Sequence, residues 1–182
     1  VLTAKDVPGK NDCSSAFGDD PVFAEDEILF YGQVAFAVVG ETRDLARKAA
    51  LKAKIDIAPI TPILTAEDAV DADTTVLPDY QFRRGSPETG MNAAEEILTG
   101  SMKIGGQEHF YLEGQVAMAQ PQEDGGMLVY SSTQHPTEIQ HTVAKVLGVP
   151  DAAVTAEVRR MGGGFGGKES QANQWAALAS VA

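Results

Sequence analysis

The residues best suited to chemistry lie together near the end of the sequence, in residues 161–170, which read MGGGFGGKES. Five glycines surround Phe165, and Lys168, Glu169 and Ser170 follow at once. Glycine loses more backbone freedom on folding than any other residue, so five together indicate a main chain that lies very close to a ligand or adopts positive φ angles. Two or three glycines would suffice for a tight turn alone. The glycine loop therefore predicts a ligand-binding backbone.

The segments on either side must position this loop. Residues 154–160 alternate between apolar and polar side chains and predict a strand. Residues 168–182 are rich in Ala, Gln and Leu and predict a helix. A glycine loop at a helix N-terminus offers unpaired N–H groups and the positive end of the helix dipole to a ligand. Glu169 then has two interpretations: an acid of the first helical turn, or a carboxylate that hydrogen-bonds a substrate beside the loop.

The loop also contains the spacing Gly162-x-Gly164-x-x-Gly167, which matches the dinucleotide-binding fingerprint. Three features oppose that interpretation. Phe165 is bulky, Glu169 places a negative charge where a pyrophosphate would bind, and the ribose-binding acid expected ~20 residues later would fall beyond the chain. We interpret the match as accidental, and a nucleotide-binding module without a redox role is the alternative from a different class.

A second glycine turn, residues 105–109 (GGQEH), follows a predicted strand. We expect His109 to be a hydrogen-bonded core histidine, His135 to lie at the start of a helix and His141 to lie on the surface. The polar residues do not show the i, i+4 spacing of a zinc site. The sequence also has no G-x-S-x-G motif of a nucleophilic serine.

Composition limits the classes of function. The chain has 26 acidic and 14 basic residues, a net charge of −12 that argues against nucleic acid and anionic membranes as partners. No apolar run approaches the ~20 residues of a membrane span. Cys13 is the only cysteine, which excludes a disulfide framework within the chain. With no visible signal peptide, we expect a cytoplasmic protein. Because the first residue is not Met and no signal ends the last helix, we expect a piece of a larger polypeptide.

The rest of the pattern predicts an α+β protein with two domains, residues 1–74 and 75–182. The first domain is a small α/β unit with two strands in residues 28–39, a helix over residues 42–54, a strand over 54–57 and a helical turn over 66–69. The second is strand-rich after an exposed connector over residues 71–93. It contains a strand run over residues 96–104, a hairpin of residues 116–119 and 127–130, and a helix from Pro136 to Gly148.

Three motifs in order along the chain carry a resemblance: residues 105–113 (GGQEHFYLE), 132–136 (STQHP) and 160–170 (RMGGGFGGKES). Together they resemble the molybdenum-binding subunit of bacterial xanthine dehydrogenases, within the molybdenum hydroxylases that also include aldehyde oxidases. The resemblance covers essentially the whole chain. It implies that residues 1–74 are the C-terminal part of an α/β hammerhead domain and that residues 75–182 begin a molybdenum cofactor-binding domain.

The resemblance implies a molybdopterin cofactor with a Mo-oxo-sulfido centre. In that family a molybdenum hydroxide attacks an electron-poor carbon of a purine, taking hypoxanthine to xanthine to urate, and a hydride passes to the sulfide. Electrons then pass through 2Fe-2S clusters to FAD and NAD in other domains or subunits. The implied partners are those iron–sulfur and FAD parts, the remainder of the molybdenum subunit and a purine, in a dimer of heterodimers. An aldehyde or another N-heterocycle is the alternative substrate.

The resemblance also assigns roles to individual residues. Gln107 corresponds to the glutamine whose amide approaches an oxygen ligand of molybdenum, and the loop residues Gly163, Gly164 and Phe165 correspond to main chain against the metal and pterin. Glu169 corresponds to the glutamate that hydrogen-bonds the purine. An amide can meet an oxygen ligand without adding charge, and glycine N–H groups suit an anionic centre. The general base and most pterin contacts would lie beyond residue 182, so we expect these residues alone to hold no stable cofactor and to have no turnover.

Overall fold

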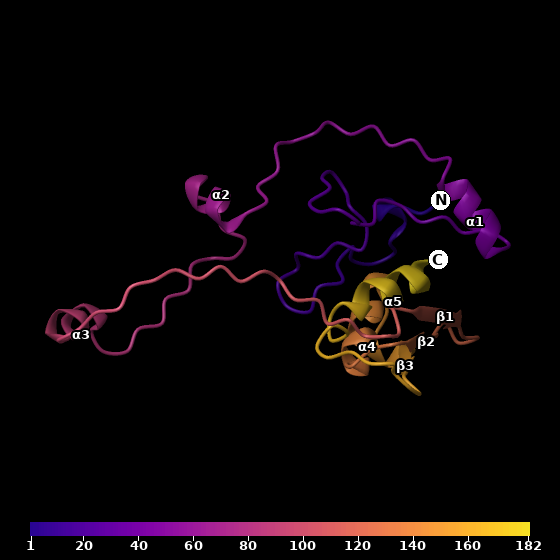
Figure 1. The fold of residues 1–182 in the computed structure, drawn as a ribbon. Helices are drawn as coiled ribbons and strands as arrows, with labels where there is room; N and C mark the ends of the chain where they lie inside the picture. The colour runs from indigo at the N-terminus through magenta and orange to yellow at the C-terminus, as the bar shows by residue number, and fades with distance from the viewer. The chain divides into compact units, whose positions relative to one another are not determined.

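The computed structural model describes all 182 residues and has the predicted α+β composition. It divides into two compact units, residues 1–53 with 107–182, and residues 54–106. The first unit contains the only sheet, in the order β1 (Ala117–Pro121), β2 (Met127–Ser131) and β3 (Val154–Glu157) (Figure 1). β1 and β2 form the predicted antiparallel hairpin, whereas β2 and β3 are parallel. The sheet is therefore mixed.

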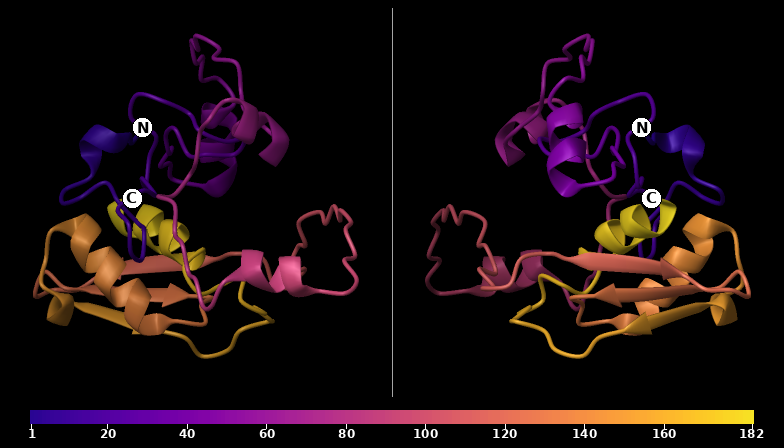
Figure 2. Two further views of the ribbon diagram at one scale, coloured as in Figure 1. Left: turned by 90° about the vertical axis from the view of Figure 1, so that its left-hand side faces the viewer. Right: turned by 90° about the vertical axis from the view of Figure 1, so that its right-hand side faces the viewer.

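A parallel pair needs a crossover connection, and α4 (Pro136–Leu147) supplies it between β2 and β3. The side chain of His135 caps this helix by accepting a hydrogen bond from the Glu138 N–H at 3.0 Å, and Gly148 ends it with a φ of 70°. The predicted start and end of this helix, and the predicted position of His135 at its start, are thus confirmed. α4 packs on β3, while α5 (Ala172–Val181) packs on β1 and β2, as the two views of Figure 2 show.

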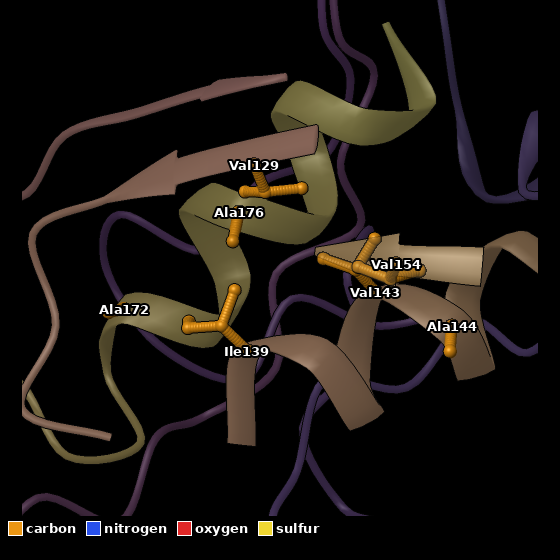
Figure 3. Close-up of a cluster of buried hydrophobic side chains, with 7 residues drawn as sticks. All are labelled: Val129, Ile139, Val143, Ala144, Val154, Ala172 and Ala176. Atoms are coloured by element: carbon orange, nitrogen blue, oxygen red, sulfur yellow. The ribbon is translucent and has the colours of Figure 1, made fainter. Parts of the chain in front are cut away.

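Small and β-branched side chains fill the space between the sheet and these helices. This core is fully buried and drawn in Figure 3: Val129, Ile139, Val143, Ala144, Val154, Ala172 and Ala176. A second buried cluster joins both helices to the N-terminal segment: Cys13, Val22, Phe23, Val146 and Ala177. Short 3-10 turns lie at Ala4–Asp6 and Asp151–Ala153. The two helices therefore fix the sheet on one side and residues 1–37 on the other.

Gly9 shows how closely the N-terminal segment approaches α4. Its N–H donates to the Val146 carbonyl at 2.7 Å, and a Cβ added to it would lie 2.4 Å from the Lys145 oxygen and 2.5 Å from the Gly148 nitrogen. Because the obstacles are backbone atoms, Gly9→Ala should lower the free energy of unfolding by about 1–3 kcal/mol. Thermal unfolding of the purified protein measures this. Gly114→Ala, which meets nothing within 4 Å, is the matched control, and an equal loss in both would contradict the expectation.

Several predicted strands are wrong. Residues 28–39, 54–57 and 96–104 form no strand, and the pairing near the first of them is one bridge between Leu2 and Ala37 and one hydrogen bond from Ala24 N–H to the Val34 carbonyl. A strand requires a continuous neighbour for its N–H and C=O groups, and these segments find at most isolated partners in the chain. Consequently the small α/β unit predicted for the first domain does not form as a sheet.

The helices are mostly where the sequence predicts them, with shorter bounds. α1 (Arg43–Ala50) begins after Thr42, whose hydroxyl accepts from the Leu45 N–H at 3.2 Å, but it stops before residue 54. In the second unit, α2 (Ala66–Asp71) matches the expected helical turn. α3 (Pro87–Ala93) is a helix within the predicted connector. No helix has the length and apolar character to cross a membrane. The domain boundary near residue 74 stays a prediction.

Candidate functional site

The glycine loop connects β3 to α5 and has the unusual backbone that its sequence predicts. Gly163 and Gly166 have φ angles of 97° and 92°, which favour glycine. Phe165 also has a positive φ, 52°, a conformation that costs a bulky residue energy and that marks functional loops. Its side chain is 74 % exposed. The loop therefore holds an aromatic ring out of the core on a strained backbone.

The other glycines of the loop allow close approach by the two other motifs. A Cβ added to Gly162 would lie 2.5 Å from the Glu113 Cβ, and one added to Gly164 would lie 2.4 Å from the Gln134 Oε1. A Cβ on Gly167 would lie 2.5 Å from a ring carbon of Tyr111. The three motifs, separated in sequence, therefore meet around one loop.

Gln134 fastens the second half of the loop. Its Oε1 accepts hydrogen bonds from the N–H groups of Gly166 (2.9 Å) and Lys168 (3.3 Å), and its own N–H donates to the Lys168 carbonyl (2.8 Å). Thr133 adds a hydroxyl hydrogen bond to that carbonyl at 3.1 Å. The Nε2 of Gln134 has no partner in the chain. The sequence interpretation overlooked this glutamine, although it lies in one of the three motifs.

An ion pair between a buried lysine and a half-buried glutamate lies beside the loop. The Lys168 side chain is fully buried, and its Nζ donates to the Glu113 Oε2 at 2.9 Å and the Ser132 Oγ at 2.8 Å. The ammonium also lies 4.7 Å from the centre of the Tyr111 ring. Lysine is almost never fully buried unless its charge is paired. Lys168 directly follows the glycine loop in sequence, but no local pattern marks Glu113 as its partner.

The carboxylate of Glu113 accepts hydrogen bonds from three different groups. The Ser132 hydroxyl, the Gly162 N–H and the Lys168 ammonium all donate to its carboxylate. The Ser132 hydrogen bond has the largest effect on the Glu113 pKa, and together the three donors lower that pKa to about 2. The carboxylate is therefore ionised at any physiological pH.

This lowered pKa predicts an acid-sensitive contribution to stability. A carboxylate with a depressed folded-state pKa stabilises the fold fully above its unfolded pKa, here 4.5, and loses that contribution as the pH falls toward about 2. The Glu113→Gln variant should accordingly show a weaker fall of its unfolding temperature between pH 5 and pH 3 than the parent protein, for roughly one titrating group. Melting curves across that range test this, with Glu138→Gln on the exposed start of α4 as the control. Parallel curves for the parent and Glu113→Gln would contradict it.

The remaining predicted site residues have different surroundings. His109 is wrongly predicted as a core histidine: its side chain is 38 % exposed, and its ring stacks on Tyr111 beside the glycines of the loop. Gln107 is exposed and makes no hydrogen bond within the chain. Glu169 is also exposed and unpaired, and it lies outside α5, whose N-cap is Gln171. The first-turn interpretation of Glu169 is therefore wrong.

Three consecutive N–H groups of the loop have no partner in the chain, those of Gly163, Gly164 and Phe165. The other loop donors are committed internally, since Gly162 bonds Glu113, Gly166 bonds Gln134 and Gly167 bonds the Gly164 carbonyl at 2.7 Å. A Gly-rich loop that cradles a dinucleotide would need those donors for its phosphates, so the geometry disfavours that alternative. The loop therefore offers a ligand three adjacent N–H donors, those of residues 163–165, one of which belongs to the exposed Phe165.

A cleft of about 310 Å³ opens next to the start of α5. Its wall near the loop includes Ser170, which follows Glu169, the amides of Gln115 and Gln174, and the indole of Trp175. This lining offers hydrogen-bonding groups and an aromatic face together. The cleft, with its mixed polar and apolar lining, therefore adjoins Ser170, the residue after the exposed carboxylate of Glu169.

Comparison with known families agrees with this geometry. A molybdopterin cofactor-binding domain family matches residues 69–182, and the a/b hammerhead domain family of aldehyde oxidase and xanthine dehydrogenase matches residues 1–60. Residues 69–182, which include the glycine loop, therefore belong to a molybdopterin cofactor-binding domain. The chain belongs to the molybdenum hydroxylase family, which includes the xanthine dehydrogenases and aldehyde oxidases.

Individual relatives come from both branches of that family. The chain is 41 % identical to xanthine dehydrogenase/oxidase of Mus musculus over 93 % of its length, and 39 % identical to aldehyde oxidase 2 of Rattus norvegicus over all of it. It spans only 13 % of the length of either relative. Among solved structures, the aldehyde oxidoreductase of Desulfovibrio gigas has a similar fold, with a TM-score of 0.77 and 23 % identity over 99 % of this chain and 22 % of that one.

The residues of the loop fit the group that this family binds. Molybdopterin is anionic, and the three free N–H groups of residues 163–165 are donors with no acidic side chain among them. Residues 163 and 164 are glycines, so these two positions have no side chain that could block a ligand from the donors. The loop can therefore hold an anionic cofactor through its main chain.

Proposed function

We propose that this chain supplies one wall of the molybdopterin site of a molybdenum hydroxylase that oxidises purines, taking hypoxanthine to xanthine to urate. The observation that carries the proposal is the row of free N–H groups at residues 163–165, held open by the positive φ angles of Gly163 and Phe165. When bound, the cofactor supplies the hydroxylation chemistry and takes up the electrons removed from the substrate.

The chain's own residues bind, orient and exclude water. The N–H groups of residues 163–165 donate to the anionic part of the cofactor, and such charge-assisted bonds are stronger than neutral ones. The exposed ring of Phe165 forms an apolar wall that keeps water from the same space. Direct ligands of the metal come from the cofactor in this proposal, and this chain has no group of three or more His, Cys, Asp or Glu side chains that could hold a metal ion.

Two glutamines are candidates for the amide that meets an oxygen of the metal centre. Gln107 holds this role by resemblance, but it is exposed and unattached. The geometry favours Gln134, because two loop N–H groups fix its Oε1 and leave its Nε2 free to donate.

This choice predicts different results for two matched variants of the complete protein. Gln134→Ala removes a fastening of the loop and the free amide together, so the molybdenum content should fall about ten- to a hundredfold, as for other groups that orient a metal site. Gln107→Ala should leave that content within about twofold of the parent. Metal analysis and the molybdenum electron paramagnetic resonance spectrum measure both. Loss in Gln107→Ala alone would return the role to Gln107.

Glu169 supports a purine as the substrate. Its carboxylate is exposed and unpaired, and it lies next in sequence to Ser170 in the wall of the cleft, so it is free to accept hydrogen bonds from ring N–H groups of a purine. An aldehyde or another N-heterocycle is the second candidate, and the similarity to aldehyde oxidase 2 of Rattus norvegicus favours it. Turnover of xanthine against benzaldehyde by the complete enzyme separates the two.

The electrons require further redox groups. We propose 2Fe-2S clusters, FAD and NAD in other parts of the enzyme, together with the remainder of the molybdenum subunit, in a dimer of heterodimers in the cytoplasm. The short span of this chain relative to xanthine dehydrogenase/oxidase of Mus musculus supports such additional parts. Absorption spectra and iron, flavin and mass analysis of the complete protein test this arrangement. A complete protein without flavin or iron would refute it.

A further inference from the structure

One side chain connects all three motifs around the glycine loop. The ammonium of Lys168 is fully buried and meets Glu113 from the first motif and Ser132 from the second, at 2.9 and 2.8 Å. The ring of Tyr111 faces it from 4.7 Å. A buried charge is costly unless well paired, so burying this one is difficult to explain by packing alone.

The same ion pair reaches both ends of the loop. At the start, the Glu113 carboxylate accepts the Gly162 N–H at 2.9 Å, and the Glu113 N–H donates to the Gly162 carbonyl at 3.2 Å. At the end, the Lys168 main chain is bonded to Gln134 through both its N–H and its carbonyl. The free donors of residues 163–165 lie between these two fixed points.

We infer that Lys168 is a positioning residue, which through Glu113 holds the N–H groups of residues 163–165 in the arrangement that receives the cofactor. This inference rests on the proposed function. Lys168 is not a catalytic residue, because its buried ammonium touches only groups of the chain. Without it, one end of the loop loses its connection to the other, and the strained backbone at Phe165 can relax.

The test uses the complete protein and the variant Lys168→Met, which keeps an unbranched side chain of similar length without the charge. Its control is Lys145→Met, since Lys145 also pairs with a carboxylate, Asp12, at 3.0 Å and with a carbonyl, that of Ser14, at 2.9 Å, but does so away from the loop. The readouts are molybdenum per chain and the fluorescence of oxidised pterin released on denaturation, with circular dichroism and the unfolding temperature as measures of folding.

We expect Lys168→Met to lose molybdenum and pterin about ten- to a hundredfold while keeping its secondary structure, as groups that orient a metal site do. Lys145→Met should keep both within about twofold of the parent. Normal cofactor content in Lys168→Met, or an equal loss in Lys145→Met, would overturn the inference.

A second variant covers the case in which Lys168→Met fails to fold because Glu113 is left without its counter-charge. Lys168→Met/Glu113→Gln removes both charges and keeps an amide oxygen that can accept the Gly162 N–H, so it should fold and still lose the cofactor. A folded double variant with normal cofactor would overturn the inference. A parent protein that contains neither molybdenum nor pterin would instead overturn the proposed function, so the two failures are distinct.

Discussion

Gly164→Ala should remove most of the cofactor from the complete protein. The added Cβ would lie 2.4 Å from the Oε1 of Gln134 and 2.9 Å from its Cγ, so the glutamine side chain must move. Moving it breaks its hydrogen bonds to the N–H groups of Gly166 and Lys168, each worth about 0.5–1.5 kcal/mol. The loop then loses the geometry of its free donors. We expect molybdenum and pterin per chain to fall by more than about tenfold.

The matched control for this substitution is Gly114→Ala. Gly114 meets nothing within 4 Å and its φ is not positive, so the same chemical change should be harmless there. Metal analysis and pterin fluorescence of both variants, with unfolding temperatures, separate loss of the site from loss of the fold. A Gly164→Ala protein with full cofactor would show that the approach of Gln134 to the loop does not matter for binding.

Glu169→Ala should damage the oxidation of purines and spare that of small aldehydes. A purine presents ring N–H groups from which the Glu169 carboxylate can accept hydrogen bonds. Losing one charged hydrogen bond costs about 1.5–3 kcal/mol. If the bond is made mainly in the transition state, kcat/KM for xanthine and hypoxanthine falls about ten- to a hundredfold. An aldehyde has no ring edge to present and loses little.

Steady-state kinetics on both classes of substrate, after molybdenum content has been checked, decide this point. Glu138→Ala is the control, because Glu138 is also an acid near the start of a helix, α4, but is remote in sequence from the loop. It should change neither activity. Equal losses on purine and aldehyde in Glu169→Ala at full metal loading would remove Glu169 from substrate binding.

Local chemistry made part of this fold predictable. The α4 helix follows from Pro136 at its start and Gly148 at its end, and the β1–β2 hairpin follows from two apolar runs around a turn. The five glycines likewise predict the positive φ angles of Gly163 and Gly166. In each case the residues that decide the structure lie within a few positions of it.

The errors and omissions concern distant partners. The apolar runs in residues 28–39 and 96–104 suit strands, but whether a strand forms depends on a neighbour that the run itself does not encode. Lys168 and Glu113 are 55 residues apart, so their ion pair becomes visible only when the motifs are folded together. His109 was predicted to be buried for the same reason, since its exposure depends on how much of it the loop covers.

The central claim is that the glycine loop holds a molybdopterin cofactor, and analysis of the complete protein for molybdenum and for pterin tests it most directly. The account predicts both in amounts equimolar with the protein, and their joint loss in Gly164→Ala while Gly114→Ala retains them. A complete, folded parent protein without molybdenum and without pterin, after expression in a host that makes the cofactor, would contradict the account.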